Sequence, residues 1–404
     1  MTEGWTTTLE TLRNRNFRWL WFGRLASSGV FQMSQLAQGW LVYELTGSAL
    51  WLGWVSSAGA ISSLLFSLYG GVIVDRVVKR DLLLWARIGL GVNTLIIAVL
   101  ISAGQIRIWH LLASSLSSGL LFCFVMPAEQ AIVAELVDGR TLLNAMALNS
   151  IAMGLMGTLS ASVAGFSIEA IGLSGVYYLM VALYTLAIFA VAKLPHTSTL
   201  TRSPHSVWAD LREGLGYVTR HSTLLVLLAL SLAWALFGTP YRTFLPKFSK
   251  EVLGMEAGGL GLLMAAQGVG GLLGSFALTS LGDSGKKGKL LIAAGVSLGV
   301  SLSLFASVRT LPLVLLFLAL AGAASNACMV TNNTLLQVNC ETRFRGRLMS
   351  MWMMTWGLTP LGTLPGGALA DRMGVPFVVV LQGTLMVIVF LAIALLRPDL
   401  RELR

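Results

Sequence analysis

The sequence predicts an all-α membrane protein with twelve transmembrane helices in two pseudo-symmetric six-helix bundles. Three features predict it: an apolar composition, a series of long apolar runs and a repeat between the two halves. Of the 404 residues, 55% are hydrophobic and only 11% are charged, whereas a soluble domain has about 25% charged residues. Backbone groups in lipid must be hydrogen-bonded within the protein, so continuous apolar runs indicate helices and not the alternating strands of a barrel.

The apolar runs have the length of roughly 20 residues that a helix needs to cross a bilayer. In the first half they cover 17–43, 51–73, 82–103, 108–135, 143–169 and 174–193. In the second half they cover 223–248, 257–281, 289–308, 311–339, 346–370 and 375–397. This predicts an N-terminal bundle over 1–194, a linker over 195–221 and a C-terminal bundle over 222–404.

The basic residues predict the orientation in the membrane. If the spans alternate, twenty of the 28 Lys and Arg residues lie on the side that holds both termini, and six lie on the other. Cytoplasmic loops are rich in Lys and Arg, so both termini are predicted to face the cytoplasm from an inner (plasma) membrane. The basic residues are spread over the segments between the apolar runs and do not form one basic face or tail. This distribution argues against binding to nucleic acid, despite the net charge of +10.

The second half repeats parts of the first, at an offset of 208 residues and later of 203. Leu52 matches Leu260, Asp75 matches Asp283, and Arg140 matches Arg343. Parallel repeats of this kind are typical of transporters. The polar linker between the halves is predicted to contain a short amphipathic helix that lies on the cytoplasmic membrane surface. Its expected cap and apolar face are Ser203, Pro204, Trp208, Leu211, Leu215 and Val218.

The most specific motif lies in the loop between the second and third spans, with a degenerate copy at Asp283. It consists of Gly71, Asp75, Arg76, Lys79 and Arg80. This motif resembles that of the major facilitator superfamily in the same loop. The superfamily pattern has a second Gly at the position where this chain has Val78. The strings 12–17, 39–48, 144–149 and 345–347 resemble the branch of enterobactin exporters and macrolide efflux proteins. The resemblance covers nearly the whole chain.

The resemblance implies the major facilitator fold and a gate at the cytoplasmic side. It places Asp75 near the start of the eleventh span, where free amides and the helix dipole favour a carboxylate. Arg76, Lys79 and Arg80 would hold Asp75 and bind lipid headgroups, and breaking the contact would open this side. Alternatively, Lys79 and Arg80 only set the topology.

Two charges inside predicted spans are candidates for substrate binding or coupling. Arg24 lies in the first span and Glu129 in the fourth, just after Pro127. The resemblance implies that both spans line the central cavity, so the two residues could pair at its cytoplasmic mouth. A structural salt bridge, or an Arg24 that snorkels to the surface, is the alternative. Glu129 is the candidate for proton coupling, although a nearby Arg24 opposes the rise in pKa that coupling requires.

Neutral polar and aromatic residues mark the walls of the predicted cavity. They are Gln32 and Gln35 on the first span, Asn326, Asn333 and Gln337 on the tenth, and Trp352 and Trp356 on the eleventh. Such walls suit an uncharged or amphipathic organic molecule. Hydrogen bonding between helices is the alternative explanation.

These features together predict a secondary active transporter that works by alternating access. We expect a monomeric exporter of small amphipathic molecules of drug or siderophore type, with protons as the candidate coupling ion. An importer or lipid transporter of the same fold, or a membrane sensor that transports nothing, are the alternatives. The sequence has no nucleophile with its base, no ATP-binding loop and no metal-ligand spacing, so an enzyme, a cofactor and a metal are not expected.

Overall fold

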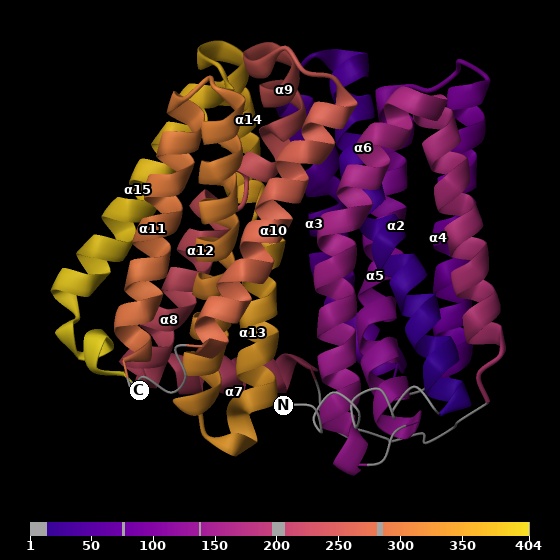
Figure 1. Cartoon of the computed structure of the whole chain (residues 1–404). Helices are drawn as coiled ribbons and strands as arrows, with labels where there is room; N and C mark the ends of the chain where they lie inside the picture. Colours follow the sequence, from indigo (N-terminus) through magenta and orange to yellow (C-terminus); the bar gives the residue numbers. More distant parts are fainter. Residues whose placement is uncertain (1–13, 75–76, 137–138, 196–206, 281–285, 404) are drawn as a thin grey trace. The chain divides into compact units, whose positions relative to one another are not determined.

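The computed structural model describes residues 14–74, 77–136, 139–195, 207–280 and 286–403. These residues form helices joined by short turns, with no strand among them. Figure 1 shows the helices coloured along the chain, from indigo through magenta and orange to yellow. The predicted all-α class of the major facilitator fold is confirmed.

The first half of the chain forms five long helices. They are α2 (Arg15–Thr46), α3 (Ala49–Val74), α4 (Lys79–Ser102), α5 (Ile108–Leu136) and α6 (Gly139–Ala192). The last of these contains both the fifth and the sixth predicted spans. It breaks at Gly172, whose φ of 72° and ψ of 169° are not helical. Glycine adopts this conformation readily because it has no Cβ.

The second half begins with a short linker helix and continues with more broken spans. In chain order its elements are α7 (Val207–Arg220), α8 (Ser222–Ala233), η2 (Trp234–Gly238), α9 (Tyr241–Leu253), α10 (Ala257–Ser280), α11 (Lys287–Ser307), α12 (Leu311–Val338), η3 (Thr342–Phe344), α13 (Arg345–Gly357), α14 (Pro360–Met373), α15 (Val375–Leu396) and η4 (Pro398–Glu402). The seventh predicted span is α8, the π-helical turn η2 and α9. The eleventh is α13 and α14, separated just before Pro360, which has no N–H to continue a helix.

Helix occupies every one of the twelve predicted spans, with ends that differ by a few residues. Among the described residues, nine helical stretches are long and apolar enough to cross a membrane on their own. The helix α2 is not one of them, because three arginines and several amides lower its hydropathy. The helices α13 and α14 have 13 and 14 residues, and each is too short to cross alone.

The chain packs into two compact units. Unit 1 contains residues 1–45 and 61–204, and unit 2 contains residues 46–60 and 205–404. The helix α3 is therefore shared, since its first part packs with the second half of the chain. The division into bundles over 1–194 and 222–404 with a linker between them stays a prediction.

Polar side chains join the helices of unit 1. The Gln38 amide of α2 donates to the Ser115 hydroxyl of α5 at 2.8 Å. The Asn93 amide of α4 donates to the Ser118 hydroxyl of α5, also at 2.8 Å. In an apolar environment such bonds satisfy groups that would otherwise lack a partner.

Glycines bring the helices of unit 2 into backbone contact. A Cβ on Gly274 of α10 would lie 2.7 Å from the Ala323 carbonyl oxygen of α12, and one on Gly270 would overlap the Ala319 carbonyl. Only glycine allows helices to approach so closely.

The linker helix α7 packs on the start of α13. The Glu213 carboxylate lies 2.9 Å from the Arg347 guanidinium, and the Tyr217 ring stacks on Phe344 with centroids 4.0 Å apart. Val218 is buried, whereas Leu215 is 55% exposed. The predicted cap, Ser203 and Pro204, lies outside the described residues, as do the side chains of Trp208 and Leu211. The position of α7 on a membrane surface stays a prediction.

Candidate functional site

The turn between α2 and α3 prepares the amino end of α3 to bind a negative charge. Gly47 has a φ of 61°, which reverses the chain in two residues. Ser48 then caps α3, because its hydroxyl oxygen accepts a hydrogen bond from the Trp51 amide at 3.3 Å. The amides of Ala49 and Leu50 have no partner within the helix, as is usual in the first turn.

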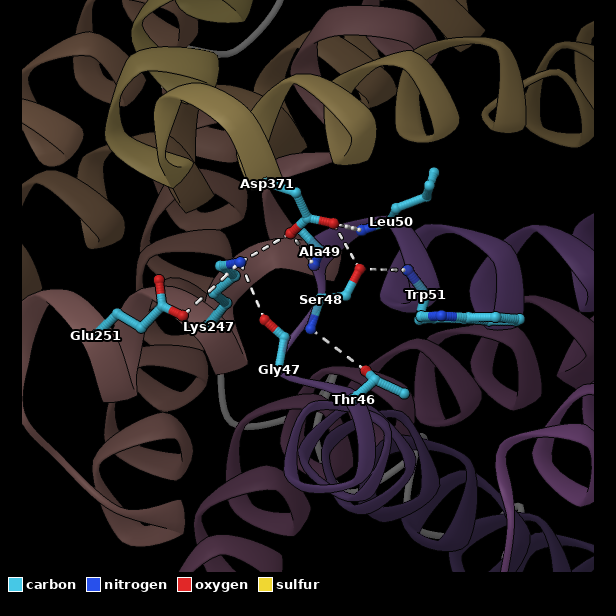
Figure 2. A network of polar contacts seen from close by, with 9 residues as sticks. All are labelled: Thr46, Gly47, Ser48, Ala49, Leu50, Trp51, Lys247, Glu251 and Asp371. Atoms are coloured by element: carbon cyan, nitrogen blue, oxygen red, sulfur yellow. Dashed lines mark hydrogen bonds and ion pairs between the residues drawn. The ribbon is translucent and has the colours of Figure 1, made fainter.

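The Asp371 carboxylate of α14 binds this helix end (Figure 2). It accepts from the Ala49 amide at 2.7 Å, the Leu50 amide at 3.1 Å and the Ser48 hydroxyl at 2.5 Å. Free amides and the positive end of the helix dipole both stabilise a carboxylate at this position. The start of the second span is thus held by the end of the eleventh.

Lys247 of α9 completes the network. Its ammonium lies 2.7 Å from Asp371, 3.0 Å from the Gly47 carbonyl oxygen and 3.7 Å from Glu251. Only 9% of the Lys247 side chain is exposed, against 27% for Asp371. Burial raises the pKa of the Asp371 carboxyl, but the hydrogen bonds from Lys247, Ser48 and the two amides outweigh it, so that the pKa lies below its usual value. Asp371 is therefore charged at neutral pH. We call this group of Ser48, Lys247 and Asp371 the latch.

Small residues let α3 and α14 touch beside the latch. A Cβ on Gly367 would lie 2.7 Å from the Ala49 carbonyl oxygen, and a Cβ on Gly53 would lie 3.2 Å from the Thr363 carbonyl oxygen. The two backbones are therefore in direct contact.

Sequence reasoning did not assign a role to the latch, although a signal exists. The string Gly366-Gly367-Ala-Leu-Ala-Asp371-Arg372 repeats the pattern of Gly70-Gly71-Val-Ile-Val-Asp75-Arg76. The string at 70–76 contains the predicted gating motif, and the string at 366–372 is a further copy of the same pattern.

Half of the six predicted gating residues lie in the part of the chain that the structure describes. Asp75, Arg76 and Asp283 lie outside the described residues. Gly71 is in the last turns of α3, and Lys79 begins α4. Arg80 lies 2.8 Å from Asp81 and donates to the Ala192 carbonyl oxygen at 2.8 Å. The role of the motif as a gate stays a prediction.

Glu129 lies between two arginines in unit 1. The Arg24 Nε of α2 is 3.6 Å from one carboxylate oxygen, and the Arg87 Nη2 of α4 is 2.5 Å from the other. Arg87 is completely buried and also donates to the Ala187 carbonyl oxygen at 3.1 Å and the Ser27 hydroxyl at 3.3 Å. The predicted partner Arg24 is thus within ion-pair distance, but the shorter contact comes from Arg87. Arg87 belongs to the predicted third span, 82–103, and sequence reasoning assigned it no role.

The neutral residues predicted to line the cavity fall into two groups. In unit 1, the Gln32 amide donates to the Gly157 carbonyl oxygen at 3.4 Å, a contact between helices, while Gln35 is exposed. In unit 2, the Gln337 amide donates to Asn333 at 2.6 Å. Asn326 has a buried side-chain oxygen without a hydrogen-bond partner in the described part of the chain.

The predicted tryptophans belong to a larger aromatic group. Trp352 and Trp356 have ring centroids 5.4 Å apart, and Trp356 lies 5.6 Å from Trp234 of η2. A small pocket lies beside them, lined by Ser231, Trp234, Cys328, Met329, Asn332 and Trp352. Of these six, the sequence predicted only Trp352. The role of Trp352 and Trp356 in substrate binding stays a prediction.

A repeated, many-spanned helical chain with buried ion pairs and a carboxylate on a helix end is typical of secondary transporters. The family model for transmembrane secretion effectors matches residues 6–403. The chain belongs to this family of the major facilitator superfamily, and the predicted resemblance is confirmed. It is a multi-pass membrane transporter of small molecules and not an enzyme.

Curated relatives and solved structures agree with this assignment. The chain is 25% identical to the multidrug efflux pump Tap of Mycolicibacterium fortuitum, over 90% of this chain and 91% of the relative. It is 23% identical to the staphyloferrin A transporter of Staphylococcus aureus (85% and 86% covered) and 22% identical to macrolide efflux protein A of Streptococcus pyogenes (96% of both).

Solved structures show the same fold at low sequence identity. The nucleoside transporter NupG gives a TM-score of 0.76 at 13% identity, over 95% of this chain and 99% of that one. The human organic anion transporter MFSD10 gives 0.67 at 17% identity, over 94% and 99%.

Proposed function

We propose that the protein is a secondary active exporter of small amphipathic organic molecules and that it works by alternating access across the plasma membrane. The latch is the observation that carries this proposal, because it joins the second span to the seventh and eleventh spans through polar contacts. The efflux and siderophore relatives support the direction and the kind of substrate.

The chemistry of the latch suits a contact that forms and breaks. A carboxylate, an ammonium and free helix amides bind strongly when they meet, yet each is well solvated by water when they separate. The neighbouring contact between Gly367 and Ala49 involves little side-chain interlocking. Loss of the latch would therefore release α3 without leaving unpaired groups in an apolar core.

The latch would close the outer side of the transporter. With both termini in the cytoplasm, as the basic residues predict, the first residues of α3 and the last of α14 lie at the outer surface. The predicted gate at Asp75 would close the inner side. Each aspartate would then follow the same Gly-Gly-x-x-x-Asp-Arg pattern and secure one side while the other is open.

Glu129 is the proposed site of proton coupling. Its protonation would leave Arg24 and Arg87 without this counter-charge, so proton uptake requires that a guanidinium moves or gains another partner. Arg24, with the longer contact and 13% exposure, is the arginine that moves in this proposal. Arg87 is fixed by the Ala187 carbonyl and Ser27.

Transport in proteoliposomes tests the proposal. The protein is reconstituted with an imposed pH gradient of either direction, and the movement of dyes, macrolides, siderophores and lysolipids is followed. We expect one class of compound to move in the direction opposite to the flow of protons. Movement with the protons would indicate an importer, movement of lysolipids alone a lipid transporter, and no movement of any compound a sensor.

A further inference from the structure

The C-terminal turn η4 folds back onto the start of α11 (Figure 1). The Leu403 carbonyl oxygen accepts a hydrogen bond from the Gly288 amide at 3.1 Å, and Leu400 is only 3% exposed. A Cβ on Gly288 would overlap the Leu400 carbonyl oxygen, so only a glycine lets the two backbones lie so close. The first turn of α11 and η4 therefore form one continuous surface at this end of unit 2.

The joined surface is strongly basic. The segments 286–289 and 397–403 bring three lysines and two arginines together against two acidic residues. Lys289 is exposed, and the Arg401 Cα would lie 3.4 Å from a Cβ on Gly288, between two of the lysines in sequence. The first turn of α11 has no acidic residue, although lysines at the amino end of a helix oppose its dipole. An anion that covers this basic surface would remove the repulsion.

Exposed leucines adjoin the basic surface. Leu395 and Leu396 at the end of α15 are 74% and 77% exposed, the two highest values among the large apolar side chains that the structure describes. Since α15 is long and apolar enough to cross a membrane, these side chains face the acyl chains of the bilayer. Arg397 follows directly, and its guanidinium donates to the Ser222 hydroxyl of α8 at 2.7 Å. Partners for an acyl chain and for an anion thus lie side by side.

We propose that the start of α11, η4 and the end of α15 bind an anionic phospholipid of the inner leaflet. Its phosphate contacts the exposed Lys286 and Lys289 and the half-buried Arg401, while an acyl chain packs on Leu395 and Leu396. With both termini in the cytoplasm, as the basic residues predict, this surface lies at the negatively charged inner leaflet. The inference does not depend on the proposed transport function.

Matched lipids test the charge of the ligand. Phosphatidylglycerol and phosphatidylcholine with the same acyl chains are titrated into the purified, delipidated protein in detergent, and native mass spectrometry gives the affinity of each. A basic residue near a membrane surface raises the affinity for anionic lipid about fivefold, so we expect the wild-type protein to prefer phosphatidylglycerol by about tenfold or more. Equal affinities for the two lipids would overturn the proposal. Inorganic phosphate is the third probe, and binding as tight as that of phosphatidylglycerol would overturn it as well, because the ligand would then be a free ion.

A charge-removing variant locates the lipid. Lys289→Gln should lower the affinity for phosphatidylglycerol about fivefold and leave that for phosphatidylcholine unchanged. Arg309→Gln is the matched control, because Arg309 is also an exposed cation but follows the opposite end of α11. It should change neither affinity. Equal losses in the two variants would show that net charge alone controls binding and would contradict the proposed site.

Gly288→Ala tests whether the two segments form the site together. Its Cβ would displace η4 and move Arg401 away from the lysines, while the charge of the protein stays the same. We expect a loss of about fivefold in the affinity for phosphatidylglycerol, the effect of one basic residue. If the variant elutes as aggregate in size exclusion, Lys289→Gln decides. An unchanged affinity in folded Gly288→Ala protein would contradict the proposal, because η4 would then contribute nothing.

Discussion

Two carboxylates, Asp371 in unit 2 and Glu129 in unit 1, are neutralised in different ways. Asp371 is 27% exposed and meets one lysine, a hydroxyl and two helix amides. Glu129 is 8% exposed and meets two guanidiniums. Water can replace the partners of Asp371 when helices separate, whereas the fixed Arg87 keeps Glu129 in place. The contacts of Asp371 therefore suit a reversible gate, whereas Glu129 would need a moving arginine before it could exchange a proton.

Removal of Arg87 should have the largest effect on stability. Arg87→Leu leaves the buried Glu129 with Arg24 alone of the two arginines, and breaking a buried pair costs about 3–5 kcal/mol. We expect a lower midpoint of thermal unfolding in detergent, measured by fluorescence-detected size exclusion. Arg24→Leu is the control and should cost less, because its contact is longer and partly exposed. A larger loss for Arg24→Leu would reverse the assignment of the fixed and the mobile arginine.

Asp371→Asn should weaken the latch without unfolding the protein. The amide keeps an acceptor for the helix but loses the charge opposite Lys247, and a hydrogen bond to a charged group contributes about 1.5–3 kcal/mol. We therefore expect the modification rate of an Ala49→Cys reporter, placed in a background without native cysteines, to rise by about ten- to a hundredfold. Ala49 is fully buried in the latched state, so a membrane-impermeant maleimide reports opening.

Glu251→Gln is the matched control for the latch. Glu251 also faces Lys247, but at 3.7 Å and with 45% of its side chain exposed, and such surface pairs contribute little. Its effect on Ala49→Cys labelling should be small. Labelling that rises equally in both variants would show that charge near Lys247, and not the bond to α3, controls opening.

The latch should not respond to pH near neutrality. The pKa of Asp371 is below its ordinary value, so the latch is fully formed above pH about 4 and is lost only as the pH falls through the lowered value. Labelling at Ala49→Cys, corrected for the reactivity of a free thiol, should be constant between about pH 5 and 8. A change of flux with pH in that range would then come from another group, and Glu129→Gln should remove it. An unchanged pH profile in Glu129→Gln would exclude Glu129 as the coupling site.

The sequence predicted the fold better than the sites. Apolar runs and basic loops recur along the whole chain, and each span adds its own evidence for the fold. A few uncertain helix ends therefore do not change the predicted fold. The latch depends instead on a tertiary meeting of Ser48, Lys247 and Asp371 from three elements, which no local pattern specifies. Sequence reasoning assigned Arg87 no role for the same reason, because its partners Glu129 and Ala187 lie 42 and 100 residues away along the chain. Only the repeated Gly-Gly-x-x-x-Asp-Arg string could have indicated Asp371.

The smallest effect is expected from a single methyl group beside the latch. Gly367→Ala places a Cβ 2.7 Å from the Ala49 carbonyl oxygen, so α3 and α14 must separate by a few tenths of an ångström. Hydrogen bonds weaken as they lengthen, and Ala49→Cys labelling should rise by a few-fold, on the order of 1 kcal/mol. Gly346→Ala is the control, because its Cβ would meet nothing within 4 Å and it also lies in a helix. If both variants leave labelling unchanged while Asp371→Asn raises it, the latch depends on charge and not on close backbone contact.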